Sequence, residues 1–483
     1  MSLTEKTLTE VRDLLRNGDT TSVALTQAIL DRIEAVDGKV QAYVRTTAEL
    51  ALKQAQAADV RLAAGETTPL LGVPIGIKDL ICSKGVETTA GSKILEGFKP
   101  PYNAFVTDQL KEAGAVIVGM TNTDEFGMGS STEFSAYQNT YNPWDLTRVP
   151  GGSSGGSAAA VSGGMAYGSL GTDTGGSVRM PASLCSLVGV RPTYGRVSRW
   201  GVIAYASSLD QVGTFGKTVK DAATMLGVVA GHDPRDSTSL MRPVPDYEAA
   251  LTGDIKGLKV GVPKQYFIDG MNPEIETSVR QALDVMANLG AEIHEIDLHM
   301  TDYALAAYYL IATSEASANL ARYDGIRYGP RVAGKDVTDT TMKTRALFGP
   351  EVKSRIMLGT FALSSGYYDA YYGKALKART LIIRDFEKAF EKVDVIATPT
   401  SPDTAFKPGE RTLDPLEMYL SDIYTVSLNL SAGCGLSVPC GFDSQNLPIG
   451  LQLMGNTLQE ATILNAAHAY EQATDWHKMR PTL

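Results

Sequence analysis

The segment RVPGGSSGGSAAAVSGGMAYGSLGTDTGGSVRMPAS, residues 148–183, organises the rest of this sequence. Two glycine-rich turns, 151–156 and 171–177, flank a run of small residues over 158–168 that predicts a tightly packed helix or strand–helix pair. Glycine lets a backbone approach a neighbouring chain or a ligand closely. Each turn also presents a hydroxyl beside backbone N–H groups, which can bind an anion. The segment therefore predicts a ligand site between the two turns and not a flexible linker.

A serine in either turn needs a base before it can act as a nucleophile. The histidines lie outside any distinctive local setting; they are His232, His294, His299, His468 and His477. A lysine can replace histidine when desolvation lowers its pKa from about 10.4 to roughly 7–8. Lys78 suits this role because it ends the apolar stretch Val-Pro-Ile-Gly-Ile, and strand alternation sends Asp79 to the opposite face.

Three elements in order are similar to the signature of the amidase signature family. They are the segment GVPIGIKD at 72–79 and the two glycine-rich turns, whose Ser153 and Ser177 lie 24 positions apart. The similarity continues through SLDQVG at 208–213, YDGIRYG at 323–329 and GTFALSSGYY at 359–368. Met180, Phe134 and Ser186 depart from the Gln, Asn and Gly that are usual in the most similar members. The resemblance implies an α/β fold: a large, mostly mixed β-sheet covered by helices on both faces.

The resemblance also implies a Ser-cisSer-Lys triad. Ser177 would attack an amide carbon to give an acyl-enzyme, and Ser153, which follows a cis peptide bond, would pass the proton to Lys78. We expect Asp173 to brace the turn or Ser153 and not to react directly. The oxyanion hole would consist of the backbone N–H groups of Thr174, Gly175, Gly176 and Ser177.

Substrate selection is expected elsewhere in the chain. Free glutamine carries an α-carboxylate and an α-ammonium, so its pocket needs one cation and one anion. The resemblance points to Arg355 for the carboxylate and to Asp422 for the ammonium. A hydroxyl would come from the Tyr308-Tyr309 pair, with Tyr308 preferred and Tyr309 left open.

The implied function is glutamine hydrolysis within a carbon–nitrogen ligase that uses glutamine as amido donor. The ammonia would convert Glu-tRNA(Gln) to Gln-tRNA(Gln) in a cytoplasmic heterotrimer with subunits B and C. This chain would hold no cofactor or metal, and ATP and Mg²⁺ would bind the partner. A net charge of −10 argues that the partner also carries most of the tRNA contact. The alternative is a stand-alone amidase with the same triad acting on another small amide.

Composition and periodicity also predict the compartment, the domain organisation and the long helices of this chain. No run approaches the ~18 apolar residues of a membrane span, and four scattered cysteines predict buried thiols in a reducing compartment. We expect one domain over 1–483, with an N-terminal helical layer over about 1–65 and the signature core over about 70–215. Apolar spacing predicts long helices over 303–321 and 361–392, and Thr457 predicts the N-cap of the last helix.

Two other kinds of site could account for the glycine-rich turns. The run Gly-Gly-Ser-Ser-Gly at 151–155 satisfies the nucleophile elbow of α/β-hydrolases, but the preceding residues are polar and proline-containing and do not predict a strand. A phosphate cradle would need GxxxxGK[ST], which does not occur in the sequence, or a GxGxxG that convincingly follows a strand, which is not found either.

Overall fold

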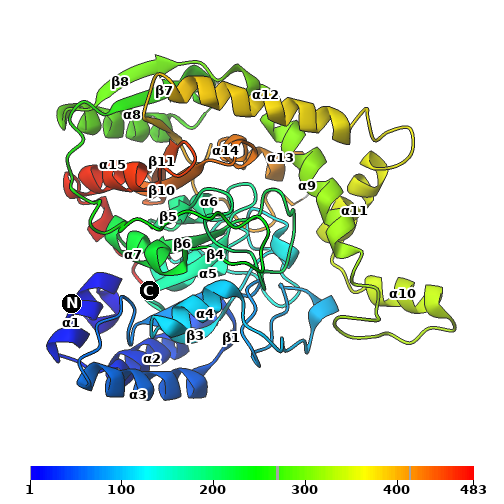
Figure 1. Ribbon diagram of the computed structural model, residues 1–483, viewed down its shortest axis with the longest axis horizontal. Coiled ribbons are helices and arrows are strands. Elements are labelled where there is room, and N and C mark those ends of the chain that lie inside the picture. Colours follow the sequence, from blue (N-terminus) through cyan, green and yellow to red (C-terminus); the bar gives the residue numbers. More distant parts are fainter. Residues whose placement is uncertain (1, 268–270, 413–414) are drawn as a thin grey trace.

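The computed structural model describes residues 2–267, 271–412 and 415–483. Over these residues the strands form an 11-stranded sheet in the order β1-β3-β2-β4-β6-β5-β10-β11-β9-β7-β8 (Figure 1). The pairs β3–β2–β4 and β9–β7–β8 are parallel, whereas the edge pair β1–β3 and the central block from β4 to β9 are antiparallel, so the expected mixed sheet is confirmed. The strands are β1 Tyr43–Thr46, β2 Pro74–Lys78, β3 Val116–Thr121, β4 Gly168–Thr172, β5 Val188–Arg191, β6 Val212–Gly216, β7 Lys259–Pro263, β8 Glu292–Ile296, β9 Val395–Pro399, β10 Cys434–Phe442 and β11 Pro448–Gly455.

Helices surround this sheet. In the described part of the chain, none is long and apolar enough to cross a bilayer. The helices are α1 Leu8–Asn17, α2 Ser22–Val40, α3 Ala48–Ala63, α4 Phe105–Glu112, α5 Gly155–Ser162, α6 Arg179–Leu184, α7 Val219–Val229, α8 Pro273–Asn288, α9 Ala304–Leu320, α10 Val337–Arg345, α11 Pro350–Ala362, α12 Tyr372–Phe390, α13 Pro415–Leu420, α14 Val426–Ser431 and α15 Glu460–Gln472.

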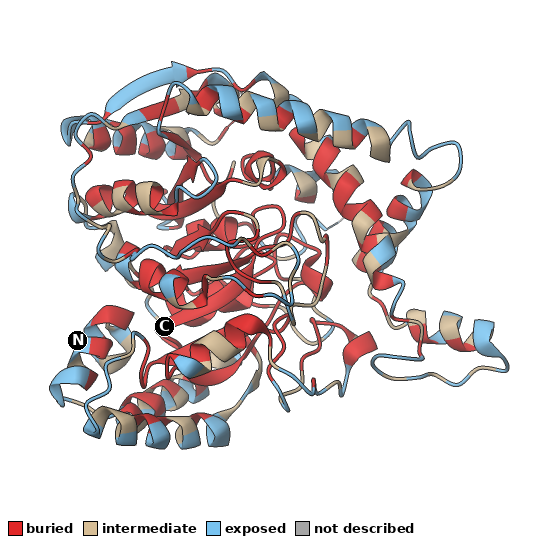
Figure 2. Ribbon diagram, in the orientation of Figure 1, coloured by how far each residue is buried: buried red, intermediate tan, exposed pale blue. Residues whose placement is uncertain are grey.

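Both faces of the sheet are covered. In β4, a side chain at Gly168 would meet α7, whereas one at Gly171 would meet Ser154 at the start of α5. In β11, Gly455 faces α15 and Gly450 faces α6. Within each strand the two glycines are an odd number of residues apart, so they point to opposite faces of the sheet. The helices that they meet therefore lie on opposite faces. The centre of the sheet is buried, and β8 at its edge is largely exposed (Figure 2).

The N-terminal layer is mostly helical. The predicted helices are present as α1, α2 and α3, but the chain also enters the sheet through β1, which pairs with β3 at the other edge. This strand has four residues and includes Arg45 and Thr46, too short a run for alternation to reveal. The strands of one sheet come from residues 43 to 455.

Two helix predictions are wrong. The run 361–392 is not one helix, because α11 ends at Ala362 and α12 begins at Tyr372. Gly366 lies between them with φ of 85°, a left-handed conformation that a helix cannot contain. The last helix begins at Glu460 and not after Thr457, because Leu458 also adopts a left-handed φ of 63°.

Glycines in the sheet explain why the small-residue run packs so tightly. The run forms α5 and leads into β4, as a helix–strand pair. Gly171 leaves room for Ser154, and Gly189 in β5 faces Ala182 of α6, where an added Cβ would lie 2.5 Å from the alanine Cβ. The two glycine-rich turns can therefore lie directly against the sheet, close to β2, the strand that carries Lys78.

Candidate active site

Lys78 is the last residue of β2, and its side chain is fully buried. Its Nζ donates to the Oγ atoms of Ser153 and Ser154, both at 2.8 Å, and to Thr172 Oγ1 at 2.9 Å. Ser153 and Ser154 belong to the first glycine-rich turn, and Thr172 ends β4 beside the second. The structure thus gathers three hydroxyls around one amine.

Burial makes this amine suitable as a base. Desolvation lowers the pKa of Lys78 to about 7, although the carboxylates of Asp124, Asp173 and Asp210 act in the opposite direction. Asp79 points away from the lysine and accepts a hydrogen bond from Arg45 at 3.1 Å. The prediction that strand alternation separates Lys78 from Asp79 is confirmed.

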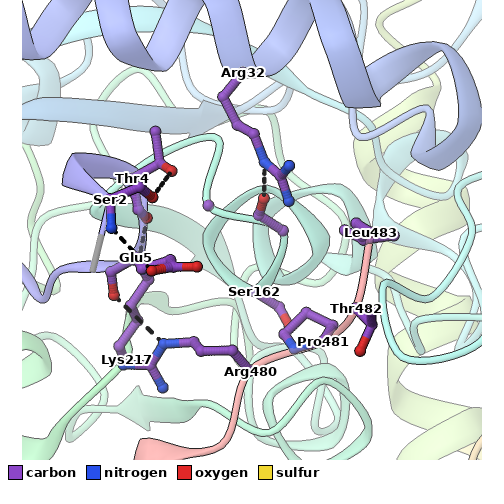
Figure 3. Close-up of a pocket in the computed structure, with 12 residues that line it drawn as sticks. Ser2, Thr4, Glu5, Arg32, Ser162, Lys217, Arg480, Pro481, Thr482 and Leu483 are labelled. Atoms are coloured by element: carbon purple, nitrogen blue, oxygen red, sulfur yellow. Dashed lines mark hydrogen bonds between the residues drawn. The ribbon is translucent and has the colours of Figure 1, made fainter.

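A second buried lysine shows that burial alone does not create such a site. Desolvation also lowers the pKa of Lys217 to about 7. Its Nζ donates to the carbonyl oxygens of Thr4 and Lys6, both at 2.8 Å, beside a cavity of about 360 Å³ near the chain termini (Figure 3). Within the described residues, no hydroxyl is hydrogen-bonded to Lys217. Lys78 differs because every partner of its amine is a hydroxyl.

A loop over residues 124–134 supports the first turn. The Gly152–Ser153 peptide bond is cis, as the resemblance implies. Asp124 lies against Gly152 so closely that a side chain there would collide with its carboxylate. This carboxylate accepts the N–H of Thr132 at 2.9 Å and that of Phe134 at 3.1 Å. Asp124 therefore holds the loop and the first turn together.

The second turn is held by Asp173. Its carboxylate accepts from Arg179 at 3.1 Å and from the Asn429 amide at 2.8 Å, and all three side chains are fully buried. Burial alone would raise the pKa of Asp173, but Arg179 and Arg191 hold it well below its usual range. Asp173 is thus a permanent anion that braces the turn, as expected.

This bracing changes the expected set of oxyanion donors. The Gly176 N–H donates to Asp173 Oδ1 at 2.9 Å, so it is already engaged, contrary to the expectation for that residue. Among the described residues, nothing accepts a hydrogen bond from the N–H groups of Thr174, Gly175 or Ser177. Three donors therefore remain available beside the Ser177 hydroxyl, whose side chain is at the edge of the buried region.

Both glycines before Ser177 are required by close neighbours. An added Cβ at Gly175 would lie 2.5 Å from the Tyr308 hydroxyl. Gly176 has φ of 132°, and a side chain there would collide with Thr425. The turn can therefore approach residues from the C-terminal half of the chain only because these two positions lack side chains.

The expected cation and anion are both buried near this turn. Arg355 donates from Nε to Glu351 at 2.7 Å and from Nη1 to the Tyr205 hydroxyl at 2.8 Å. In the part of the chain that is described, its Nη2 has no acceptor. Asp422 accepts from Ser130 at 2.9 Å, and burial raises the pKa of its carboxyl to about 7.

The two adjacent tyrosines have different positions. Tyr308 packs against Gly175 in the second turn, whereas the Tyr309 hydroxyl donates to Asp422 at 3.0 Å. The Tyr309 ring stacks on Tyr419 with centroids 3.9 Å apart. Tyr308 is therefore the tyrosine beside the turn, and Tyr309 supports the anion.

Sequence reasoning did not single out every residue at the site. Ser154 and Thr172 contact Lys78, but their types are ordinary in a glycine- and serine-rich segment. Tyr205 and Tyr419 lie against Arg355 from distant segments that carry no local signal.

The residues that depart from the resemblance lie in buried surroundings around the turns. Met180 is buried in α6 beside Leu184 and Ala405, and Phe134 packs against a small cluster that includes Val149. Ser186 adopts φ of 56°, which accounts for the glycine that is usual at this position.

Comparison with known proteins finds relatives that match along almost the whole chain. A model of the amidase family matches residues 24–464. The A subunits of glutamyl-tRNA(Gln) amidotransferase from Roseiflexus sp. (strain RS-1) and Moorella thermoacetica are 58% and 59% identical, covering 100% of this chain and 99% of each relative. The crystal structure of the corresponding A subunit from Thermotoga maritima is 39% identical with a TM-score of 0.80, covering 98% of this chain and 95% of its own. A peptide amidase in complex with chymostatin is 28% identical with a TM-score of 0.84, covering 99% of both chains.

The bracing role of Asp173 predicts a large loss of stability when its charge is removed. Asp173→Asn should lower the free energy of unfolding by about 3–5 kcal/mol, because buried Arg179 and Arg191 lose their counter-charge. Glu66→Gln is the control, since it breaks the partly exposed Arg61–Glu66 pair and should cost less than about 1 kcal/mol. Denaturant unfolding of both variants measures the difference. Equal losses would contradict the bracing role.

Proposed function

The chain belongs to the amidase family, and we propose that it acts as the glutamine-hydrolysing subunit of a tRNA-dependent amidotransferase. The observation that carries this proposal is a buried lysine bound to a relay serine, close to a turn whose serine lies among free N–H groups. Arg355 and Asp422 are buried nearby. They provide the cation and the anion that are needed to bind a free amino acid.

The proposed reaction forms and breaks one acyl-enzyme. Ser177 Oγ attacks the side-chain amide carbon of glutamine, and its proton passes through Ser153 to the neutral amine of Lys78. The N–H groups of the turn stabilise the oxyanion. Lys78 then returns the proton through Ser153 to the amide nitrogen, the C–N bond breaks and ammonia leaves. Water attacks the glutamyl ester, which releases glutamate and restores Ser177.

Arg355 and Asp422 select the amino acid. The unpaired Nη2 of Arg355 is available to the α-carboxylate, with Tyr308 supplying a hydroxyl beside the turn. An arriving ammonium favours the ionised form of Asp422, because it replaces the solvation that burial removed. Glutamine would therefore bring the counter-charge that Asp422 lacks in the empty pocket, and a further anion for Arg355, which is already paired with Glu351.

The amidotransferase role is favoured over a stand-alone amidase. The relatives named as amidotransferase A subunits are 58% and 59% identical over essentially their full length, compared with 28% for the peptide amidase. We place this chain in a cytoplasmic heterotrimer with subunits B and C. The partner would bind ATP, Mg²⁺ and most of the Glu-tRNA(Gln), since this chain has a net charge of −10.

The assembly itself is testable. The isolated chain should bind tRNA negligibly at physiological salt and hydrolyse glutamine poorly. Addition of subunits B and C should restore glutamine hydrolysis, with further stimulation by Glu-tRNA(Gln). Glutaminase assays with and without the partners measure this effect. Full, tRNA-independent turnover of diverse amides by the isolated chain would instead support a stand-alone amidase.

The nucleophile can be identified by trapping the intermediate. Ser177→Ala should abolish glutamine hydrolysis while leaving the unfolding midpoint within a few degrees of wild type, because Ser177 Oγ makes no hydrogen bond among the described residues. Peptide mass spectrometry of the quenched wild-type assembly should locate a glutamyl ester on Ser177. An ester on Ser153 or Ser154 would refute this assignment.

The pH dependence should report Lys78. Protonation removes the base, so kcat should fall roughly tenfold per pH unit below a pKa of about 7 and level off above it. Glutamine-bound Asp422 is paired with the ammonium, so its titration affects KM rather than kcat. Lys78→Arg should lose orders of magnitude in kcat, because a guanidinium cannot release its proton. A Lys78→Arg enzyme with a near-native rate would exclude the base role.

Arg355 and Asp422 together form what we call the glutamine clamp. Its loss should affect glutamine and a small uncharged amide differently. Arg355→Ala or Asp422→Asn should raise the KM for glutamine by about tenfold or more, because each removes one counter-charge. A small uncharged amide should lose little, since it uses neither charge. Initial rates on both substrates measure the split. Equal losses on both would mean that these residues serve the fold and not recognition.

A further inference from the structure

Helix α11 has an apolar face that is largely exposed. Met357, Leu358 and Phe361 lie on one side of this helix, and their exposed fractions are 72%, 50% and 50%. The opposite side, which includes Arg355 and Gly359, is buried against α9. Figure 1 shows α11 beside α9 at the edge of the molecule, and Figure 2 shows exposed residues along it.

Aromatic rings from the connection to α12 extend this face. Tyr367 and Tyr371 are 44% and 37% exposed, and both contact Phe361, with ring centroids 4.6 and 5.7 Å away. The two tyrosine rings also contact each other at 5.8 Å. Clustered exposed aromatic residues are typical of the energetic centre of protein interfaces. We name Met357, Leu358, Phe361, Tyr367 and Tyr371 the outer α11 surface.

The charges near this surface restrict what can cover it. Lys353, Lys374 and Lys377 lie along the same segment, against one exposed acid, Asp369, although the chain as a whole is acidic. A two-fold dimer through this surface would bring the lysines of both copies together, which is unfavourable. Nucleic acid would leave Met357 and Leu358 without apolar contacts. A different protein with an apolar centre and an acidic rim fits both properties.

We propose that the outer α11 surface is where a partner subunit of the amidotransferase docks on this chain. This inference rests on the proposed function, because relatives named as A subunits imply further subunits. The exposed aromatic and methionine side chains match the residue types that are enriched in protein interfaces. The occupant is a protein chain that presents acidic residues to Lys353, Lys374 and Lys377.

The outer α11 surface and the proposed glutamine-binding residue Arg355 lie on the same helix, so binding of a partner subunit can affect substrate binding. Arg355 lies on the opposite side of the same helix, and α11 contacts α9 so closely that a side chain at Gly359 would collide with the Thr313 carbonyl. Helix α9 carries Tyr308 and Tyr309. A partner bound to the outer surface would therefore restrain the helix that carries Arg355 and the helix whose Tyr309 donates to Asp422.

The test is a titration of purified subunits B and C against the whole chain. The double variant Phe361→Ser/Tyr367→Ser should bind them about tenfold or more weakly than wild type, and should lose the stimulation of glutamine hydrolysis by the partners. The control Val60→Ser/Met241→Ser removes apolar side chains that are 72% and 81% exposed elsewhere, and should bind normally. Met357→Lys is a second test that alters only an exposed side chain and should also weaken binding.

The outcomes are distinguishable. Unchanged binding by both α11 variants would overturn the docking site while leaving the proposed function intact. A wild-type dimer in sedimentation that Met357→Lys disrupts would also overturn it, in favour of a second copy. If the isolated wild-type chain binds tRNA and Met357→Lys strengthens that binding, the surface is occupied by RNA, which would also overturn it. If wild type itself does not bind subunits B and C, the proposed function fails, and this inference fails with it.

Discussion

The burial of the Lys78 amine is the interaction on which the rest of the site depends. An amine without solvent is neutral near pH 7 only if the groups around it are polar and uncharged, and here Ser153, Ser154 and Thr172 meet this requirement. Serine and threonine hydroxyls can reach one atom at the end of β2 only when the surrounding backbone is close. The glycines of β4 and of the two turns provide this closeness, so the composition of 148–183 follows from the needs of one amine.

The second constraint is the anion at Asp173. A carboxylate close enough to influence Lys78 would raise the pKa of the amine, but Arg179 and Arg191 largely neutralise it. Asn429 completes the network from α14, far along the sequence, and Thr425 packs against Gly176. The turn that carries Ser177 is therefore held by the C-terminal half of the chain, and the site cannot form from 70–215 alone.

Helix α11 combines two roles on opposite sides. Its buried side holds Arg355, whose charge is balanced by Glu351 and surrounded by tyrosine rings. Its exposed side carries the aromatic outer surface. Because a helix moves as a rigid body, a protein that binds one side also acts on the other. This arrangement provides a physical route by which a partner could make glutamine hydrolysis depend on assembly.

The sequence alone singled out Lys78 and the two serine turns and determined the opposite orientation of Asp79, because these depend on residue type, spacing and strand alternation within short segments. It also indicated the mixed α/β fold and most helices outside the glycine-rich core. The tertiary structure decided which hydroxyls meet Lys78, that Gly176 donates to Asp173, and which of Tyr308 and Tyr309 lies beside the turn. It also revealed the break between α11 and α12 and the glycine-rich strands. These features depend on contacts between residues far apart in the chain, about which local periodicity carries no information.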